Sequence, residues 1–383
     1  MKLVIDAVGA STGGNITILN NVLYYLSVID KGLQIIVYIE KTPAKKYFIF
    51  TNDKIDIVTT DDKSLPKKIM WQQFGLHKAV QENGGDVILS ITNIGSFFPK
   101  VPQVVYFHQA LLFIPNKQLF GFFGFSYIIR FKVLKFFVIL GFLKAKAIIA
   151  QTEFVKQSIV KQLPSIKNKV HRVYSGVPKV FEVQQGKWEI PKKIEKEFKI
   201  LYIAHPAEYK NFDILFETAK LAKEKNIQFK FLLTLDRSSD NPRYQNFISQ
   251  YLAKIQAYGI EEYIYFTGSL KNSVEIKEAY LFTDVVIHPS LVESFPQTFT
   301  EAMQFGKPLI SIDLPYAKEI AGNASLYFKN DSINLLEKIL QYQKDSQLFK
   351  EMSKKSKERI NFFDPMKRWD KLYKIIKLVK NEK

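Results

Sequence analysis

Two glutamates with seven residues between them are the side chains best suited to bind a polar substrate. Glu293 follows a short β-branched run, and Glu301 lies in a segment with helical spacing from Phe299 to Phe305. A carboxylate at the edge of a groove can accept hydrogen bonds from sugar hydroxyls. The alternative is that Glu293 caps the helix and Glu301 is a solvated helix residue, because acids are common in the first turn. Spacing alone leaves both interpretations open.

The residues between the two glutamates predict an anion site built from backbone. Pro296 suits the first helical position, where its missing N–H costs nothing. The free N–H groups of Phe295, Gln297 and Thr298 would then face a groove, and such groups at a helix N-terminus bind anions such as a diphosphate.

Two further polar side chains follow predicted strands. His108 stands after the strand Gln103–Phe107, at the kind of strand end where open α/β sheets bind ligands. Lys210 follows the strand Lys199–Ala204, after His205. A lone histidine is more often structural and a lone lysine is usually a solvated surface charge, so neither decides a function by itself.

Glycines mark two other turns that could approach a ligand. Gly13 and Gly14 lie between the first strand and the first helix, where backbone can approach a phosphate closely, although their spacing is not that of a dinucleotide fingerprint. Gly268 follows the strand Tyr263–Phe266. A plain tight turn explains each of these as well.

The string from His288 to Pro308 resembles a known signature. His288-Pro-Ser, Glu293-Ser-Phe-Pro-Gln and Glu301-Ala-Met-x-x-Gly-Lys-Pro308 are similar to the donor site of the family-four retaining glycosyltransferases, which have the GT-B fold. The resemblance implies that Glu293 holds the hydroxyls of the donor sugar and that Glu301 holds the ribose. It implies that the helix-end residues Phe295–Thr298 face the diphosphate.

The resemblance assigns roles to the other candidates. Lys210 would bind the diphosphate and neutralise the leaving group, and His108 would lie beside the anomeric carbon. Gly268 would pass the nucleobase, and the Gly13–Gly14 turn would border the diphosphate. The chain departs from the family where Ala204 and His205 replace a glycine and an arginine, and a histidine replaces that arginine only when protonated.

Strands alternate with helices through both halves of the chain, which predicts two doubly wound α/β domains with a cleft between them. We expect an N-terminal acceptor-side domain, 1–180, joined by the last helix, 365–383, and a C-terminal nucleotide-sugar-binding domain, 198–364. Residues 179–197 mix Lys, Glu and Pro with little periodicity and form the candidate linker.

The chain of 383 residues carries a net charge of +18 and no cysteine. Its basic character suits nucleic acid, an anionic membrane or an anionic substrate, but lysine enrichment alone also explains it. We expect no metal and no other cofactor, because the five histidines lack ligand spacing and no Asp-x-Asp motif stands in a suitable loop. No secretory signal is present, which predicts a cytoplasmic protein.

The stretch 118–146 is unusually rich in phenylalanine and is interrupted by Arg130, Lys132 and Lys135. Its charge-free pieces are shorter than the ~20 residues of a spanning helix. It is either a buried helix with snorkelling cations or a peripheral contact with an anionic membrane.

The predicted reaction is transfer of a sugar from a nucleotide-diphosphate donor to an acceptor hydroxyl with retention of configuration. A glycan or lipid-linked acceptor in bacterial surface glycan assembly (lipopolysaccharide, O-antigen or capsule) fits the resemblance. Two alternatives stay open: another GT-B enzyme such as a sugar-nucleotide epimerase, and a basic nucleic-acid-binding protein, although we expect no nucleic-acid partner.

Overall fold

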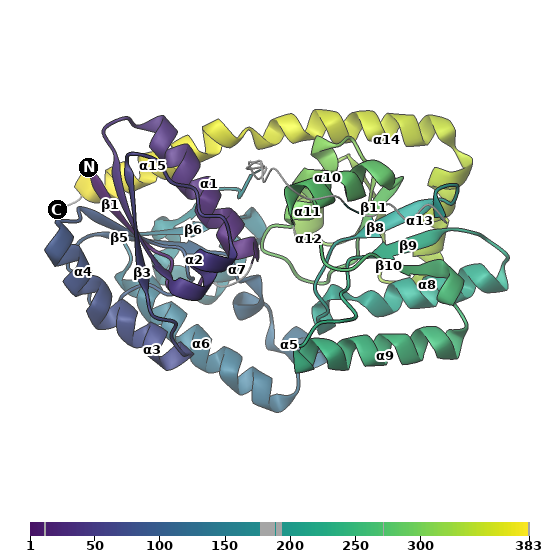
Figure 1. Ribbon diagram of the computed structural model, residues 1–383, viewed down its shortest axis with the longest axis horizontal. Coiled ribbons are helices and arrows are strands. Elements are labelled where there is room, and N and C mark those ends of the chain that lie inside the picture. Colours follow the sequence, from purple (N-terminus) through teal and green to yellow (C-terminus); the bar gives the residue numbers. More distant parts are fainter. Residues whose placement is uncertain (11–12, 177–187, 189–193, 271, 382–383) are drawn as a thin grey trace. The chain divides into compact units, whose positions relative to one another are not determined.

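The computed structural model describes residues 1–10, 13–176, 188, 194–270 and 272–381 (Figure 1). The chain divides into two compact units, Met1–Pro178 with Asp364–Lys383 and Lys179–Phe363. Most of the candidate linker, 179–197, lies outside the described residues.

The first unit is built on a parallel sheet. Its described strands have the order β3-β2-β1-β4-β5-β6-β7. Successive strands are added toward one edge from β1 to β3 and toward the other edge from β4 onward, so the strand order reverses between β1 and β4. Most of these strands are buried along their length, as expected for a parallel sheet covered on both faces. They are β1 (Lys2–Asp6), β2 (Gln34–Glu40), β3 (Ile55–Thr60), β4 (Val87–Ser90), β5 (Gln103–Phe107), β6 (Ala147–Ala150) and β7 (Val170–Arg172).

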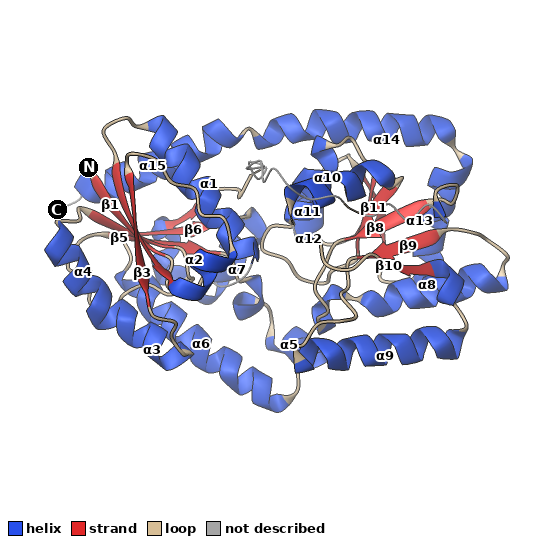
Figure 2. Ribbon diagram, viewed as in Figure 1, coloured by secondary structure: helices blue, strands red, loops and turns tan. Residues whose placement is uncertain are grey.

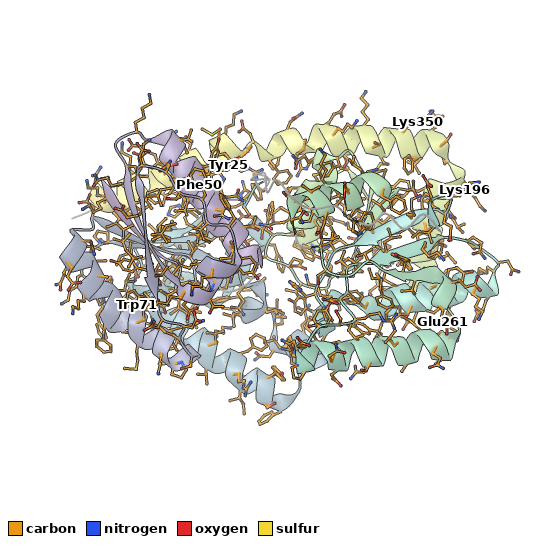
Figure 3. All side chains as sticks on the ribbon, in the orientation of Figure 1. Tyr25, Phe50, Trp71, Lys196, Glu261 and Lys350 are labelled. Carbon is orange, nitrogen blue, oxygen red and sulfur yellow. The ribbon has the colours of Figure 1, made fainter. Side chains whose placement is uncertain are left out.

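Helices cover both faces of this sheet (Figure 2). One face packs against the first and last helices, where Tyr25 stacks on Trp369 with ring centroids 6.0 Å apart (Tyr25 is labelled in Figure 3). The last helix is therefore part of the first unit's core. The helices are α1 (Gly13–Ile29), α2 (Lys41–Lys46), α3 (Leu65–Met70), α4 (Leu76–Asn83), α5 (Asn116–Phe122), α6 (Phe125–Lys144), α7 (Glu153–Gln162) and α15 (Pro365–Asn381).

Both α4 and α6 cover the opposite face. Val4 and Ile88 point to α4, whereas their strand neighbours point to the α1 side. Phe107 alternates with Tyr106 in the same way and packs edge-on against Phe142 of α6 at 5.4 Å. The outer surfaces of α4 and α6 therefore lie on the same side of the unit.

The sequence predicts that Trp71–Gln81 is helical, and the structure is helical there, with a change of helix type within the segment. Residues Trp71–Gly75 form a π-helical turn before α4 (Trp71 is labelled in Figure 3). The Trp71 ring lies on Gly75, where an added Cβ would come within 2.3 Å of a ring carbon. A glycine at position 75 therefore leaves room for the Trp71 ring. The wider π-helical turn places Gln72 and Gln73 in the interior.

The second unit repeats the architecture. Its described strands have the order β10-β9-β8-β11-β12-β13, all parallel, with the reversal between β8 and β11. The strands are β8 (Lys199–Tyr202), β9 (Lys230–Leu233), β10 (Ile264–Phe266), β11 (Val285–His288), β12 (Leu309–Ile312) and β13 (Ser325–Phe328). The helices are α8 (Phe212–Glu224), α9 (Pro242–Tyr258), α10 (Ser273–Phe282), α11 (Gln297–Gln304), α12 (Pro315–Ala321), α13 (Ser332–Lys344) and α14 (Ser346–Arg359).

Two parallel sheets with helices on both faces confirm the predicted fold class of paired doubly wound domains. The sequence does not predict the edge strand β13 at Ser325–Phe328.

Candidate active site

The candidate residues of the second unit gather where the sheet reverses direction. The loop after β8 carries Lys210, and the loop after β11 carries Glu293. These loops are joined by a backbone hydrogen bond of 2.8 Å from Leu291 N–H to the carbonyl of Tyr209. A reversal of strand order leaves a crevice at the strands' carboxyl ends, the common ligand position in open α/β sheets.

Lys210 and Glu293 form a largely buried ion pair. Lys210 Nζ lies 2.5 Å from Glu293 Oε1, and the two side chains are 14% and 16% exposed. Burial opposes the charged form of each, but the partner charge outweighs it. The pKa of the Lys210 ammonium is therefore raised and the pKa of the Glu293 carboxyl is lowered. Both groups are charged at neutral pH.

The backbone around Lys210 is fixed from three sides. Lys210 ends a short 3₁₀ turn, and its carbonyl accepts a 2.8 Å hydrogen bond from the Tyr202 hydroxyl. That hydroxyl also lies 3.0 Å from Ser290 Oγ. Asn211 follows with φ of 56° and donates from Nδ2 to the Pro289 carbonyl at 3.2 Å. Asparagine suits this left-handed position better than most residues.

His288 extends the polar cluster toward the helix that follows. Its Nε2 lies 3.6 Å from Glu293 Oε1, and its Nδ1 lies 3.2 Å from the Thr298 hydroxyl. Burial lowers the pKa of His288, against the raising effect of Glu293. The cluster therefore connects Lys210 and Glu293 to the first turn of α11.

Glu301 lies on the second turn of α11 and contacts the same helix end. Its Oε2 accepts a 2.8 Å hydrogen bond from the Tyr280 hydroxyl, which also lies 3.4 Å from the Thr298 carbonyl. Burial raises the pKa of Glu301, although the Tyr280 hydrogen bond acts to lower it. Glu293 thus precedes the N-terminus of α11 in the chain, and Glu301 follows it by one turn.

The start of α11 differs from the expectation by one position. Pro296 is the residue before the helix, with φ of −73° and ψ of 98°, and the helix begins at Gln297. The extended ψ of Pro296 fits the cap position, so the first turn is Gln297, Thr298 and Phe299. The side chain of Phe295 is buried and packs on Phe363 at 5.9 Å. Its side chain is a core residue, and any part in ligand binding falls to its backbone.

His205 does not supply a cation in this unit at neutral pH. Burial lowers its pKa, and the neighbouring Lys210 ammonium lowers it further. Gly268 follows β10 with φ of 75°, and an added Cβ would meet nothing within 4 Å. Its left-handed backbone rather than a lack of space favours glycine there.

His108 lies in the first unit, at the carboxyl end of β5, and Asn93 fixes its protonation. Asn93 Oδ1 accepts a 2.7 Å hydrogen bond from the His108 backbone N–H, which identifies that atom as the oxygen. The Asn93 amide nitrogen, 3.1 Å from His108 Nε2, must then donate to it. His108 therefore carries its proton on Nδ1, a buried atom with no protein partner, and burial lowers its pKa to about 4.

A second buried network holds the loop that carries Asn93. Gln72 Nε2 donates to Asp6 Oδ2 at 3.1 Å and to the Thr92 hydroxyl at 2.8 Å. Burial raises the pKa of Asp6 to about 6. Gly14 lies in the first turn of α1, with open space where a Cβ would be, and Gly13 begins that helix.

Residues 185–359 match the family "Glycosyl transferases group 1". These residues form a group 1 glycosyl transferase domain. A 151-residue segment is 29% identical to the trehalose synthase of Pyrococcus horikoshii, covering 39% of this chain and 36% of that protein. The chain thus spans about a third of that relative's length.

Solved structures extend the similarity of fold beyond this glycosyl transferase domain. Anabaena HepE, crystallised with UDP and glucose, superposes over 98% of this chain and 99% of its own with a TM-score of 0.72 and 18% identity. WaaG, a glycosyltransferase involved in lipopolysaccharide biosynthesis, gives a TM-score of 0.72 over 98% and 99% at 15% identity. The whole chain therefore has the GT-B fold.

Several polar residues of the glycosyl transferase domain were given no role by the sequence, including His288, which belongs to the signature string. His288 ends β11 as His108 follows β5, and this shared position at a strand end was the available signal. Tyr202 and Tyr280 gave no signal, because buried tyrosines in strands and helices are usually core residues. Among the described residues, no group of three or more His, Asp or Glu is placed to hold a metal ion.

Proposed function

We propose that this protein transfers a sugar from a nucleoside-diphosphate donor to an acceptor hydroxyl, with retention of configuration and without a metal. One observation carries the proposal. A charged lysine and a charged glutamate meet at the strand reversal of the second unit, beside the N-terminus of α11, and they do so inside the segment that matches the glycosyl transferase family.

The site has the charges that departure of a diphosphate requires. When the bond from the sugar to the phosphate breaks, negative charge builds on the leaving oxygen. The Lys210 ammonium and the first N–H groups of α11 offer positive potential to that charge without needing to reorganise. The raised pKa of Lys210 keeps the ammonium protonated at neutral pH.

In the proposed donor complex, Lys210 and Glu293 bind different parts of the substrate. The ammonium has three donors, so it can bind phosphate oxygens while it stays near Glu293. Glu293, an acceptor only, would then take hydrogen bonds from the sugar hydroxyls. Glu301, already accepting from Tyr280, keeps acceptor capacity for a ribose hydroxyl.

Retention is proposed to follow from displacement on one face of the sugar. The bond from the anomeric carbon to the phosphate oxygen breaks while the acceptor oxygen bonds to the same face. The proton of the acceptor moves to the leaving phosphate, so the protein needs no separate base. His108, which the resemblance places beside the anomeric carbon, is uncharged at neutral pH, because burial lowers its pKa to about 4.

We also propose that the acceptor is a glycan or a lipid-linked glycan of a bacterial surface polymer. The similarity in fold to WaaG, described as acting in lipopolysaccharide biosynthesis, supports this class.

A thermal-shift screen tests the donor site. The wild type is heated with UDP, GDP, ADP and the matching nucleotide sugars. Hundredfold excess of the right ligand over its Kd should raise the midpoint by roughly 5–10 °C. Glu293→Gln should lose most of the added shift from the sugar. Glu224→Gln, at an exposed site on α8, is the control. Absence of any shift with the wild type would exclude the proposed donor site.

The stereochemical part has its own test. The anomeric configuration of the product is read by NMR coupling constants, with chelator present. Inversion, or a strict requirement for a divalent ion, would refute retention or metal independence respectively. Conversion of the nucleotide sugar to an epimer without acceptor would support the other GT-B chemistry instead.

A further inference from the structure

Charge is unevenly distributed along the first unit. Residues 87–152 contain no aspartate or glutamate. The same segment contains seven basic residues: Lys100, Lys117, Arg130, Lys132, Lys135, Lys144 and Lys146. The surface that this segment forms therefore has a strongly positive potential of its own.

The longest helix of this segment, α6, exposes an apolar stripe. Its exposed large apolar residues fall within about 80° of the helix circumference at 3.6 residues per turn. Phe125 is 72% exposed, and the face opposite the stripe, which includes Ile128, Val138 and Phe142, is buried in the unit. The exposed members of the stripe are Phe125, Ile129, Val133, Phe136 and Leu143.

Basic residues flank the stripe on both sides. Lys132 borders it on one edge, and Arg130 and Lys144 border it on the other, at the angles that helical spacing gives; all three are exposed. Lys135 points away and contacts Gln162. An apolar centre between cations is the pattern of a helix that lies in a membrane interface, with long cationic side chains reaching the headgroups.

Exposed apolar residues of a neighbouring segment lie on the same side of the unit. Phe97 stacks on Phe137 of α6 at 5.9 Å, and its backbone N–H donates to Gln73 of the π-helical turn at 2.6 Å. Phe98, which follows Phe97, is 68% exposed, and Phe74, which follows Gln73, is 70% exposed. The apolar surface therefore extends from α6 toward α3 and α4.

A basic pocket lies at the C-terminal end of the stripe. It has a volume of about 360 Å³ and is lined by Lys100, Lys144, Lys146 and Lys380. Lys144 directly follows the exposed Leu143, and the pocket wall at Pro99 directly follows Phe98. Lys380 is paired with Asp86 at 3.4 Å, and the cations of the other three lysines around the hollow suit a phosphate-bearing headgroup.

We propose that this face of the first unit, α6 with the four-lysine pocket, docks on an anionic lipid bilayer. The stripe enters the boundary between headgroups and acyl chains, and the flanking cations and the pocket hold lipid phosphates. None of the described helices is long and apolar enough to cross a bilayer, so the contact is peripheral. The proposal does not depend on the donor chemistry of the second unit.

A second copy of the chain fits this face less well. A two-fold interface would bring the same acid-free, basic segment against itself, and like charges in register repel. An anionic bilayer complements both the apolar stripe and the positive charge around it. Nucleic acid would meet the cations but leave the stripe unpaired.

Vesicle flotation with the full-length protein tests the docking surface. Vesicles of phosphatidylcholine alone are compared with vesicles that contain roughly 30% phosphatidylglycerol, at low and at high salt. The anionic headgroups supply the negative surface charge that attracts basic residues. We expect binding to the anionic vesicles, weakened by salt. Phe125→Ser with Phe136→Ser should weaken binding by at least about tenfold, and Arg130→Gln with Lys132→Gln by roughly thirtyfold.

Matched variants from the second unit serve as controls. Leu281→Ser with Ile333→Ser removes two exposed apolar residues, and Lys344→Gln with Lys350→Gln removes two exposed cations; neither should alter flotation. Lys100→Gln with Lys144→Gln tests the pocket and should remove the preference for anionic lipid. Circular dichroism melting verifies that each variant folds.

Four outcomes would overturn the proposal. They are failure to float with anionic vesicles, equal binding to neutral vesicles, equal loss in the control variants, and sedimentation as a dimer that Phe125→Ser dissociates. Inorganic phosphate at millimolar concentration is added in one arm. Full competition by free phosphate would assign the pocket to a soluble anion instead of a lipid.

Discussion

The ion pair between Lys210 and Glu293 connects stability with the proposed donor binding. Each charge is largely withdrawn from water and relies on the other. Removing one partner leaves the other buried without compensation, which costs more than removing both. The change in unfolding free energy when one partner is removed therefore tests whether Lys210 and Glu293 are in contact.

We predict that Lys210→Met destabilises the second unit by roughly 2–4 kcal/mol, whereas Lys210→Met with Glu293→Gln is less destabilised than that single variant. Chemical denaturation followed by tryptophan fluorescence measures both. Lys254→Met, which breaks a more exposed pair with Asp213, should cost under about 1 kcal/mol. A double variant that is at least as destabilised as Lys210→Met would contradict this prediction.

His108 offers a second test at this scale, because its tautomer follows from Asn93. In the wild type, ¹⁵N NMR of the imidazole should show the proton on Nδ1 and no titration above about pH 5, in line with a pKa of about 4. Asn93→Asp replaces the donor by a carboxylate, so Nε2 should become protonated and the pKa should rise. A proton on Nε2 in the wild type would refute the assignment of Asn93.

At the scale of elements, α6 is fixed to the first unit by one close backbone approach. A Cβ on Gly141 would lie 2.6 Å from the backbone nitrogen of Gly95. The helix therefore has to carry a glycine at this position, although glycine is a poor helix former. The approach holds the buried face of α6 on the sheet and leaves the apolar stripe outside.

Gly141→Ala should therefore lower the unfolding midpoint of the first unit, by the equivalent of roughly 1–3 kcal/mol. Gly121→Ala in α5 is the control, because nothing lies within 4 Å of its added Cβ. That change should be neutral or stabilising by up to about 1 kcal/mol. A Gly141→Ala protein as stable as the wild type would mean that α6 does not pack this closely.

Elements were predictable where one local signal dominated. Thr152 before the helical pattern predicts an N-cap, and it caps α7 by accepting a hydrogen bond from Val155 N–H. The π-helical turn was not predictable, because it depends on a Trp71 ring packing over Gly75. Strand β13 has mixed burial and lacked the buried run that marked its neighbours.

The candidate site was predictable only in part. Spacing and position singled out Lys210, Glu293 and Glu301, and their expected roles came from the resemblance. The structure pairs Lys210 with Glu293 and places Glu301 in α11 against Tyr280. Spacing did not reveal that Asn93 contacts the His108 ring or that His288 lies beside Glu293. Their contacts join segments distant in the chain, such as Asn93 with His108, and a single sequence carries no sign of such pairs.

At the scale of the whole molecule, histidines whose pKa is lowered set the response to acid. Burial lowers the pKa of His77, His108, His205 and His288. The unfolded chain takes up protons near pH 6.5 that the folded chain refuses, so stability is lost as pH falls below that value. Asp6 and Glu301 act in the opposite sense, because burial raises the pKa of both carboxyls, that of Asp6 to about 6.

The urea midpoint should therefore fall between pH 7.5 and pH 5, since the four histidines outnumber the two carboxyls whose pKa is raised. Asp6→Asn should make the fall steeper, because it removes one of these two opposing groups. Fluorescence-detected unfolding at three pH values measures this. A midpoint that rises toward pH 5 would contradict the burial of the neutral histidines.

The most direct test of the central claim is calorimetric titration of the protein with nucleoside diphosphates. The claim is that Lys210 and the end of α11 bind a diphosphate in the second unit. At least one nucleoside diphosphate should bind the wild type, and Lys210→Met should weaken it at least tenfold, about 1.4 kcal/mol, while Lys254→Met binds normally. Equal affinity of the wild type and Lys210→Met would contradict the account.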